Sequence, residues 1–372
     1  MIASLLLLAL TIFYSGFILW CNRGWKAIEV SNKKSNSQSL NVDVVIAVRN
    51  EAQVILNLLE KLVSQNYSKR NFRVVVVDDH STDNSFQIVS EFLSHHPEIN
   101  SVILHADGEG KKSAIAQAIK ISSADLILTA DGDCIVSGGW IKSMAEPFSN
   151  NEISFVAGPV VLSGGNGVFS LLQKMEMIGL TGIAGASILN RKAMMCNGAN
   201  LCYRKRAYDA VQGYLGSSFA SGDDTQLMRK MHSENPAQLT FTKSKNSIVI
   251  SHSLSNLKSF WQQRRRWATK IPFTLSFFTV CIAVVSWLVH AGLFFEMILL
   301  CFYPKIVPIF LSTFIIKLIA ELVFLKKVGS DLNQSIFPIA IIFIQPLYWL
   351  YITLIGLAVP FSSYEWKGRK VK

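Results

Sequence analysis

Acidic side chains stand directly after two short apolar runs in the N-terminal half of the chain. Asp78 and Asp79 follow the run at residues 72–77, and Asp131-Gly-Asp133 lies just after the run at residues 126–129. Mg²⁺ and Mn²⁺ prefer oxygen ligands, and they commonly join one or two carboxylates to the phosphates of a substrate. In a chain whose formal net charge is +11, these carboxylates predict a divalent metal that bridges to a phosphorylated substrate.

The apolar runs are short and rich in β-branched residues, and amphipathic stretches separate them. This alternation predicts a doubly wound, mostly parallel α/β sheet. The predicted strands are residues 42–48, 72–77, 102–105 and 126–129, and the predicted helices are residues 51–64, 85–93 and 112–121. Ligands of such sheets bind beyond the carboxyl ends of the strands, so the carboxylates are expected at the ligand-binding edge.

Other nucleotide-binding and metal-binding patterns are missing from the sequence. The first predicted strand continues as Arg49-Asn50-Glu51 rather than G-x-G-x-x-G, and there is no G-x-x-x-x-G-K-[ST]. These absences disfavour a dinucleotide-binding fold and exclude a P-loop. None of the six cysteines lies in a C-x-x-C pair, so neither a zinc site nor a disulfide framework is predicted.

The composition indicates a membrane protein. Half of the 372 residues are hydrophobic and only 16% are charged, against about 25% in soluble domains. Residues 1–22 carry no charge and are long enough to span a bilayer. They lack the basic start of a secretory signal, so they predict an uncleaved anchor. Arg23 and Lys26 follow, and the positive-inside rule then places the next segment in the cytoplasm.

Residues 271–364 are apolar again and predict three to four further spans. Lys317 and Glu321 interrupt this region four residues apart, a spacing that allows them to pair on one helix face. A cytoplasmic position for the basic tail requires an even number of spans, which favours four with a hairpin near His290. The predicted layout is an anchor (1–22), a linker (23–40), an α/β domain (41–258), an interface segment (259–270), a membrane region (271–364) and a tail (365–372).

Several short motifs recur in a fixed order along the chain. They are Ala47-Val48-Arg49-Asn50-Glu51, Asp78-Asp79-x-Ser81-x-Asp83, Gly110-Lys111, Asp131-x-Asp133, Gly222-Asp223-Asp224 and Gln263-x-x-Arg266-Trp267. Together they resemble family 2 glycosyltransferases, in the membrane-bound branch that includes cellulose, chitin, hyaluronan and poly-N-acetylglucosamine synthases and lipid glucosyltransferases. The resemblance implies a Rossmann-like GT-A fold. It also implies transfer of a sugar, with inversion, from a nucleotide-sugar donor to a membrane lipid or a growing polysaccharide.

The resemblance also implies roles for the acidic residues. Asp224 is expected to act as the general base, with Asp223 beside it at a position where the family has glutamate. Asp133 is the stronger expected metal ligand and Asp131 the second, for Mg²⁺ or Mn²⁺. The alternatives are local: Asp-Gly-Asp also suits a turn, and Ser221-x-x-Asp224 also resembles a helix cap.

The remaining motifs are assigned to the substrates. The residues expected to bind the nucleotide sugar are Ala47, Asn50, Glu51, Asp78, Asp79 and Lys111. For Asp78 a strand-end turn is an equal alternative. Lys111 departs from the family pattern because Ala116 replaces an expected asparagine. Gln263, Arg266 and Trp267 are expected at the diphosphate and the acceptor. Arg264 and Arg265 are expected at lipid headgroups, and anionic lipid is the alternative ligand for the whole cluster.

These expectations describe a metal-dependent hexosyltransferase of the cell inner membrane with a cytoplasmic catalytic domain and a UDP-sugar donor. One alternative is a non-catalytic nucleotide-sugar-binding subunit of a polysaccharide assembly complex. Another is a transporter built around Lys317 and Glu321. Nucleic acid is disfavoured as a partner because the basic residues gather at the predicted membrane edges. The sugar, the acceptor, processivity and the oligomeric state are left open by the sequence.

Overall fold

A computed structural model describes residues 1–29, 40–215, 223–235, 238–268, 276–335 and 337–358, together with the backbone of residues 364–366 and 369–371. The chain divides into two compact units. The sheet unit comprises Ala27–Ser163 and Ser187–His252. The helical unit comprises Met1–Lys26, Gly164–Ala186 and Ser253–Lys372.

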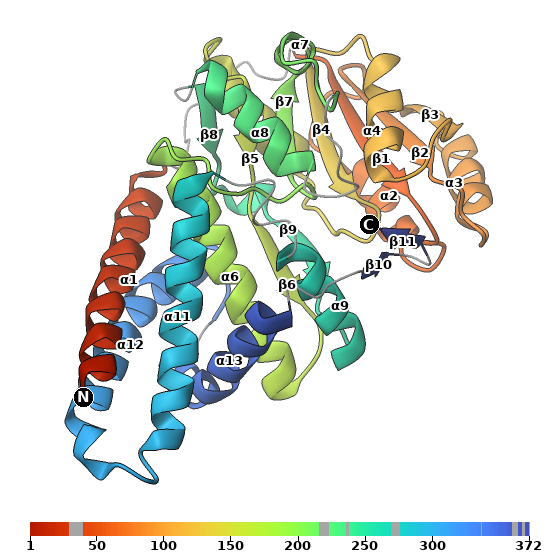
Figure 1. The fold of residues 1–372 in the computed structure, drawn as a ribbon. Coiled ribbons are helices and arrows are strands. Elements are labelled where there is room, and N and C mark those ends of the chain that lie inside the picture. The colour runs from red at the N-terminus through yellow and green to blue at the C-terminus, as the bar shows by residue number, and fades with distance from the viewer. Residues whose placement is uncertain are drawn as a thin grey trace. The chain divides into compact units, whose positions relative to one another are not determined.

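The sheet unit is built on a seven-stranded sheet of order β3-β2-β1-β4-β7-β5-β8 (Figure 1). Its strands are β1 (Val42–Val48), β2 (Phe72–Asp78), β3 (Asn100–His105), β4 (Leu126–Asp131), β5 (Phe155–Ala157), β7 (Leu201–Arg204) and β8 (Leu239–Phe241). The first four pair in parallel, whereas β7 runs antiparallel to both of its neighbours. A separate parallel pair joins β6 (Val160–Ser163) to β9 (Val249–His252). The predicted mostly parallel α/β sheet is therefore confirmed.

Near-continuous apolar strands form the core of this unit. Side chains of β1 and β2 such as Ile46 and Val76 are fully buried, as expected for strands covered on both faces. The unit's helices are α2 (Ile55–Val63), α3 (Ser85–Ser94), α4 (Lys111–Lys120), α5 (Trp140–Ala145), α7 (Lys205–Ala210) and α8 (Asp223–Glu234), with the short turns η2 (Glu146–Ser149) and η4 (Lys245–Ser247). Leu58 and Leu62 of α2 lie on one buried face, and each contributes about 1.5–3 kcal/mol by burial.

The register of the parallel strands brings their carboxyl ends to one edge. Ala47 lies opposite Asp131, and Val48 lies opposite Asp78. Asp78 in turn lies opposite His105 at the end of β3. The side chains that follow β1, β2 and β4 therefore share the ligand-binding edge that the sequence predicts.

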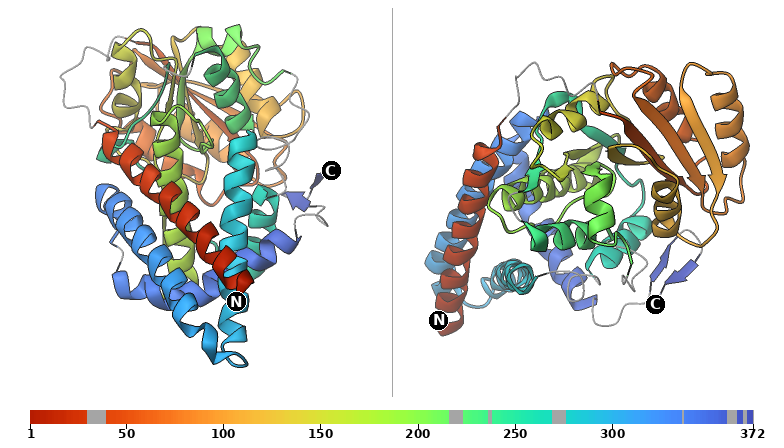
Figure 2. Two further views of the ribbon diagram at one scale, coloured as in Figure 1. Left: turned by 60° about the vertical axis from the view of Figure 1, so that its left-hand side comes forward. Right: turned by 90° about the horizontal axis from the view of Figure 1, so that it is seen from above.

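The helical unit contains α1 (Ile2–Ala27), most of α6 (Gly167–Leu189), α9 (Leu257–Ala268), α11 (Phe277–Leu299), α12 (Val307–Asp331) and α13 (Pro338–Ala358), with the turn η5 (Pro304–Ile306) and the antiparallel strands β10 (Tyr364–Trp366) and β11 (Arg369–Val371). Among the described residues, four helical segments are long and apolar enough to cross a membrane: Ile2–Ala27, Phe277–Leu299, Pro304–Asp331 and Pro338–Ala358. α1 and α12 lie side by side (Figures 1 and 2), and Trp25 Nε1 donates a 2.9 Å hydrogen bond to Asp331.

The hairpin expected near His290 is wrong. α11 runs without interruption from Phe277 to Leu299, so three long apolar helices, rather than four, follow α9 within the described residues. The His290 ring is buried within the helix, and its Nδ1 lies 2.6 Å from the carbonyl oxygen of Ser286. Gly292 makes no turn. A Cβ there would lie 2.5 Å from Leu7 of α1, so the glycine allows two helices to approach closely.

The predicted pair within the membrane region is present. Lys317 Nζ donates a 2.7 Å hydrogen bond to Glu321 on the same face of α12. Gln345 of α13 contacts both, because its Oε1 accepts from Lys317 at 2.8 Å and its Nε2 donates to Glu321 at 2.9 Å. The Tyr14 hydroxyl of α1 donates to Glu321 at 2.7 Å. Three apolar helices are thus joined through one buried ion pair.

Candidate active site

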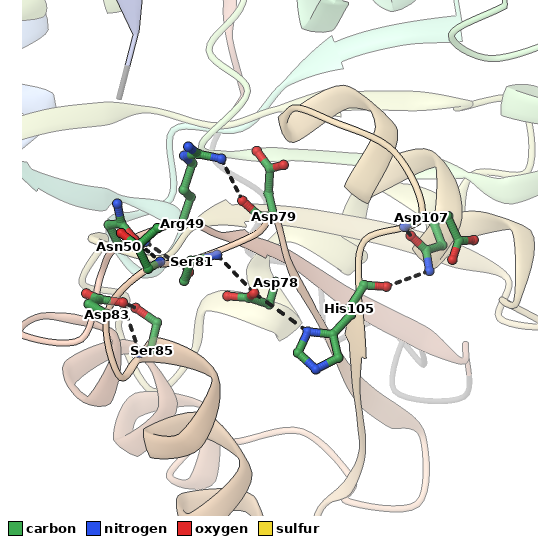
Figure 3. A network of polar contacts seen from close by, with 11 residues as sticks. Arg49, Asn50, Asp78, Asp79, Ser81, Asp83, Ser85, His105 and Asp107 are labelled. Carbon is green, nitrogen blue, oxygen red and sulfur yellow. Dashed lines mark hydrogen bonds and ion pairs between the residues drawn. The ribbon is translucent and has the colours of Figure 1, made fainter. Parts of the chain in front are cut away.

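The loops that follow β1 and β2 are held together by hydrogen bonds (Figure 3). The Arg49 guanidinium donates to the carbonyl oxygen of Asp79 at 2.9 Å. The Asn50 amide donates to Ser81 Oγ at 3.0 Å, and Asn50 Oδ1 accepts from the amide of Thr82 at 2.8 Å. Asn50 has a φ of +52°, a conformation that asparagine tolerates better than most residues. This network presents Asn50 at the edge without burying its side chain.

Asp78 and Asp79 are both buried but make different contacts. Asp78 Oδ2 accepts from the amide of Ser81 at 3.1 Å and lies 3.8 Å from Nδ1 of His105. These contacts favour the strand-end turn as the role of Asp78. Asp79 Oδ1 instead accepts from the amide of Gly110 at 2.9 Å. Gly110 has a φ of +92°, a left-handed conformation that favours glycine, and it directly precedes α4.

Lys111 is the first residue of α4, and its ammonium contacts the carboxylate of Asp131 at the end of β4. Burial lowers the pKa of Lys111, but the carboxylates of Asp131 and Asp224 raise it, and the net result is a pKa above the ordinary lysine value. Lys111 is therefore protonated at neutral pH. Lys111 thus contacts Asp131 at the end of β4 and lies within electrostatic range of Asp224, which lies in another part of the sheet unit.

The Asp131-Gly-Asp133 segment lies close to Glu51. A Cβ at Gly132 would collide with Oε2 of Glu51, so glycine at this position leaves room for the Glu51 carboxylate in its present rotamer. Cys134 follows Asp133, and its thiol lies 3.8 Å from Asp133 Oδ1. Glu51, which follows β1, therefore lies beside the Asp131-Gly-Asp133 segment that follows β4.

The carboxylates at this edge suit a hard divalent cation. Asp131 and Asp133 offer oxygen ligands only, which Mg²⁺ and Mn²⁺ prefer. Across the described ranges, no group of three or more acidic, histidine or cysteine side chains is placed to enclose a metal ion. A magnesium ion that takes one or two carboxylates and completes its shell with phosphates and water needs no such group. The donor set therefore fits a metal that binds together with a phosphorylated ligand.

Asp224 is held in place by two backbone amides. Its Oδ1 accepts from the amide of Thr225 at 2.8 Å, within the first turn of α8. Its Oδ2 accepts from the amide of Gly198 at 2.8 Å. The carbonyl oxygen of Gly198 accepts from Thr129 Oγ1 at 3.0 Å, which anchors the loop to β4. The side chain of Asp223, and Ser221 with its predicted cap, lie outside the described residues.

The cysteines beside the carboxylates are neutral thiols. Burial raises the pKa of Cys134, and the charges of Asp131 and Asp133 raise it further. The pKa of Cys196 is raised in the same way, mainly by burial and to a smaller extent by the charge of Asp224. Because the thiolate is the nucleophilic and metal-binding form of cysteine, these buried neutral thiols are unsuited to either role.

The Gln263-x-x-Arg266-Trp267 motif lies on α9 in the helical unit. The predicted contact of Arg264 with lipid headgroups is wrong, because its side chain is buried. Its Nε and Nη2 donate to Glu176 Oε2 at 2.8 and 2.5 Å. Glu176 lies 88 residues earlier in the chain, so no local sequence pattern predicts that it is the partner of Arg264. Gln263, Arg266 and Trp267 are half-buried on the same helix.

Two further residues contribute to this edge although no role was predicted for them from the sequence. Arg49 fixes the backbone at Asp79, and Gly198 fixes the side chain of Asp224. The contact of Gly198 joins residues 26 positions apart in sequence, so no local pattern predicts it.

Comparisons with known proteins agree with this architecture. The family model described as glycosyl transferase family 2 matches residues 43–212. The poly-beta-1,6-N-acetyl-D-glucosamine synthase of Staphylococcus epidermidis is 22% identical over 63% of this chain and 56% of its own length. The hyaluronan synthase of Streptococcus pyogenes serotype M3 is 25% identical over 84% of this chain and 74% of its own. Several curated relatives match over only 41% to 56% of their lengths, so the chain spans about half of each.

A solved structure shares the fold. The mannosyltransferase of Pyrobaculum calidifontis, in complex with GDP-Man and Mn²⁺, superposes with a TM-score of 0.56 at 14% identity, covering 96% of this chain and 99% of its own. The α/β architecture is therefore of the GT-A type. The matched residues contain β1 to β4 and the Asp131-Gly-Asp133 segment, and residues 43–212 of this chain form a domain of glycosyl transferase family 2.

Proposed function

We propose that this protein is a metal-dependent inverting glycosyltransferase that moves a sugar from a nucleotide-sugar donor, UDP-linked, to a membrane lipid or a growing polysaccharide. One observation carries the proposal. The carboxylates of Asp131 and Asp224 lie close enough to Lys111 to raise its pKa, at the carboxyl edge of a family 2 domain. This transfer requires a carboxylate that acts as a base, a positive charge near the diphosphate and ligands for a metal, all at one site.

In the proposed step, the acceptor hydroxyl attacks the anomeric carbon of the donor sugar. The new bond forms as the bond between that carbon and the diphosphate oxygen breaks, and the hydroxyl proton passes to Asp224. The amides of Gly198 and Thr225 each bind one oxygen of this carboxylate. These bonds fix the direction of the carboxylate that would accept the proton.

The donor is held by the residues at the ends of β1, β2 and β4. Asp79 and Glu51 contact the nucleoside, and Lys111 supplies positive charge for the diphosphate. Asp133 and Asp131 would hold the divalent metal, which when bound stabilises negative charge on the leaving diphosphate. The structural neighbour in complex with GDP-Man and Mn²⁺ supports this use of a metal and a nucleotide sugar.

The acceptor is proposed to be a lipid or glycan at the cytoplasmic face of the cell inner membrane. Arg23 and Lys26 follow the apolar part of α1, and cations in that position are typical of cytoplasmic segments. Relatives named as polysaccharide synthases and as a beta-monoglucosyldiacylglycerol synthase support both acceptor classes. Gln263, Arg266 and Trp267 are the residues proposed to contact the diphosphate and the acceptor.

The metal assignment has a direct test. Full-length protein in lipid nanodiscs is given labelled UDP-sugars and GDP-mannose with membrane lipids, and labelled product is measured. Asp133→Ala, or removal of metal by EDTA, should lower transfer at least about 100-fold, since a metal supplies several kcal/mol to such a step. Mn²⁺ should restore the EDTA-treated wild type but not the variant. The control is Asp209→Ala, which removes a half-exposed carboxylate that pairs with Lys205 one turn earlier on α7.

Two outcomes of this assay would overturn the proposal. Equal transfer by the wild type and Asp133→Ala would remove the metal assignment. Binding of UDP with no transfer to any acceptor in the panel would favour the non-catalytic subunit of an assembly complex.

A second prediction concerns the loop that positions the general base. A Cβ at Gly198 would lie 3.0 Å from Oδ2 of Asp224, so the larger side chain in Gly198→Val must displace the carboxylate. Misplacement of a catalytic group by about 1 Å can cost about 100-fold in rate. We expect Gly198→Val to lower transfer by about that factor while calorimetry detects unchanged UDP affinity. Weaker UDP binding would instead mean that the variant disturbs the whole edge.

A further inference from the structure

A buried arginine lies inside the motif of α9. Arg264 is 3% exposed and follows Gln263 directly. Its guanidinium donates through Nε and Nη2 to one oxygen of Glu176, at 2.8 and 2.5 Å. Glu176 lies on the part of α6 that belongs to the helical unit. The ion pair therefore ties the motif helix to a second helix of the same unit.

A third helix completes the contact. The Tyr351 hydroxyl of α13 donates to the other oxygen of Glu176 at 2.6 Å. The Tyr351 ring also lies 5.1 Å from the ring of Phe260, one turn before Arg264 on α9. Both oxygens of Glu176 are thus used, by donors from two different helices. α6, α9 and α13 meet at one buried carboxylate.

The Nη1 atom and the planar face of the Arg264 guanidinium contact other residues of α9. Its Nη1 donates to Oε1 of Gln263. Its planar face lies 4.4 Å from the ring centroid of Phe260 and 4.4 Å from that of Trp267. Phe260 and Trp267 stand four residues before and three residues after Arg264, which places all three on one helix face. The arginine therefore fixes the side chains of both ends of the motif, Gln263 and Trp267.

Stability alone is a weak reason for this arrangement. The surroundings are an apolar cluster that includes Leu172, Phe260 and Ile344. Replacing a buried ion pair in such a place by hydrophobic residues is often neutral or stabilising. What hydrophobic residues cannot supply is a planar cation that stacks on Trp267 and hydrogen-bonds Gln263 at the same time.

We propose that Arg264, held by Glu176 and Tyr351, is a positioning residue that orients Gln263 and Trp267 for the acceptor and the departing diphosphate. The inference rests on the proposed function, because it assigns those two side chains to the substrates. Arg264 itself touches no substrate. Its effect on the transfer step runs through the orientation of its neighbours, and Glu176 and Tyr351 act through Arg264 in turn.

The variants separate charge from geometry. Arg264→Lys keeps the charge but loses the planar fork and the stacking. Tyr351→Phe removes a single oxygen atom and is the variant least able to prevent folding. The control is Lys258→Met, which removes a cation from the exposed face of the same helix. Each full-length variant is prepared in lipid nanodiscs and compared with the wild type for kcat, KM for the donor and thermal unfolding.

We expect Arg264→Lys to lower kcat for transfer by about 10- to 100-fold, as misoriented groups do, with KM for the donor and the unfolding temperature unchanged. Tyr351→Phe should change kcat in the same direction by a smaller factor, and Lys258→Met should match the wild type. Arg264→Lys and Tyr351→Phe proteins that fold and transfer at the wild-type rate would overturn the inference. A wild type that consumes no donor would instead overturn the proposed function.

A second measurement is independent of activity. Protein labelled with 5-fluorotryptophan gives a ¹⁹F resonance for Trp267, assigned with Trp267→Phe. Tyr351→Phe and Arg264→Lys should both shift or broaden that resonance, and Lys258→Met should not. An unchanged Trp267 resonance in both variants would show that Arg264 and Tyr351 do not set its position, whatever the enzymatic result.

Discussion

Replacing Asp224 by asparagine should lower the rate of sugar transfer by about 10²- to 10⁴-fold, the contribution typical of a general base. Asparagine has nearly the same shape but cannot accept the proton of the acceptor hydroxyl. One amide oxygen can still accept from Thr225 or Gly198, whereas the NH₂ group then faces the other backbone donor. The loss should lie in kcat, because Asp224 acts on the acceptor hydroxyl and not on the nucleotide.

The measurement is labelled-sugar transfer by full-length protein in nanodiscs, with UDP affinity measured in parallel by calorimetry. Asp209→Asn is the matched control, because that carboxylate is about half exposed and pairs with Lys205 one turn away. It should transfer at the wild-type rate. If Asp224→Asn kept more than about a tenth of the activity, a contribution far below the usual one, the base would have to be sought elsewhere, first at Asp223.

Replacing Lys317 by methionine should destabilise the helical unit by about 3–5 kcal/mol, the cost of leaving one charge of a buried pair without its partner. The Lys317 side chain is fully buried, and its ammonium donates to Glu321 and Gln345. The remaining Glu321 would keep its bonds from Tyr14 and Gln345 but lose its only lysine contact within the described residues. Apolar surroundings cannot solvate that carboxylate.

The loss of stability is measured by titrating SDS into mixed micelles and following helicity. Lys327→Met is the control, because Lys327 and Asp331 have the same spacing on the same helix but are partly exposed, at 39% and 21%. That pair should contribute no more than about 1 kcal/mol. A double variant, Lys317→Met with Glu321→Leu, should be more stable than Lys317→Met alone. Equal losses for Lys317→Met and Lys327→Met would contradict the role given to the buried network.

Most of the sheet could be predicted from the sequence because its strands are buried on both faces. Such strands are continuous β-branched runs, so β1 was predicted with its bounds, and β2 and β4 were short only of their terminal residues. Parallel pairing then places the residues after these strands at one edge. Asp79 and Asp131 were therefore expected at one edge from their positions, whereas Lys111 was assigned to the nucleotide through the resemblance to the family.

The helices of the membrane region were harder to delimit. Uncharged sequence predicts burial in lipid but does not say where one helix ends and the next begins. A hairpin was predicted near His290, and Gly292 lies two residues further on. In the structure, both lie inside α11, where the histidine is next to a backbone carbonyl and the glycine accommodates Leu7.

The sequence by itself determined the fold class, the acidic edge and the apolar character of both ends of the chain, because these depend on residue type and on spacing within one element. Only the tertiary structure decided that Gly198 holds Asp224 and that Glu176 holds Arg264. Each of these contacts joins residues on different elements, far apart along the chain. Hydrogen bonds and ion pairs act over a few ångströms of space, and a linear sequence does not show which distant residues folding brings within that range.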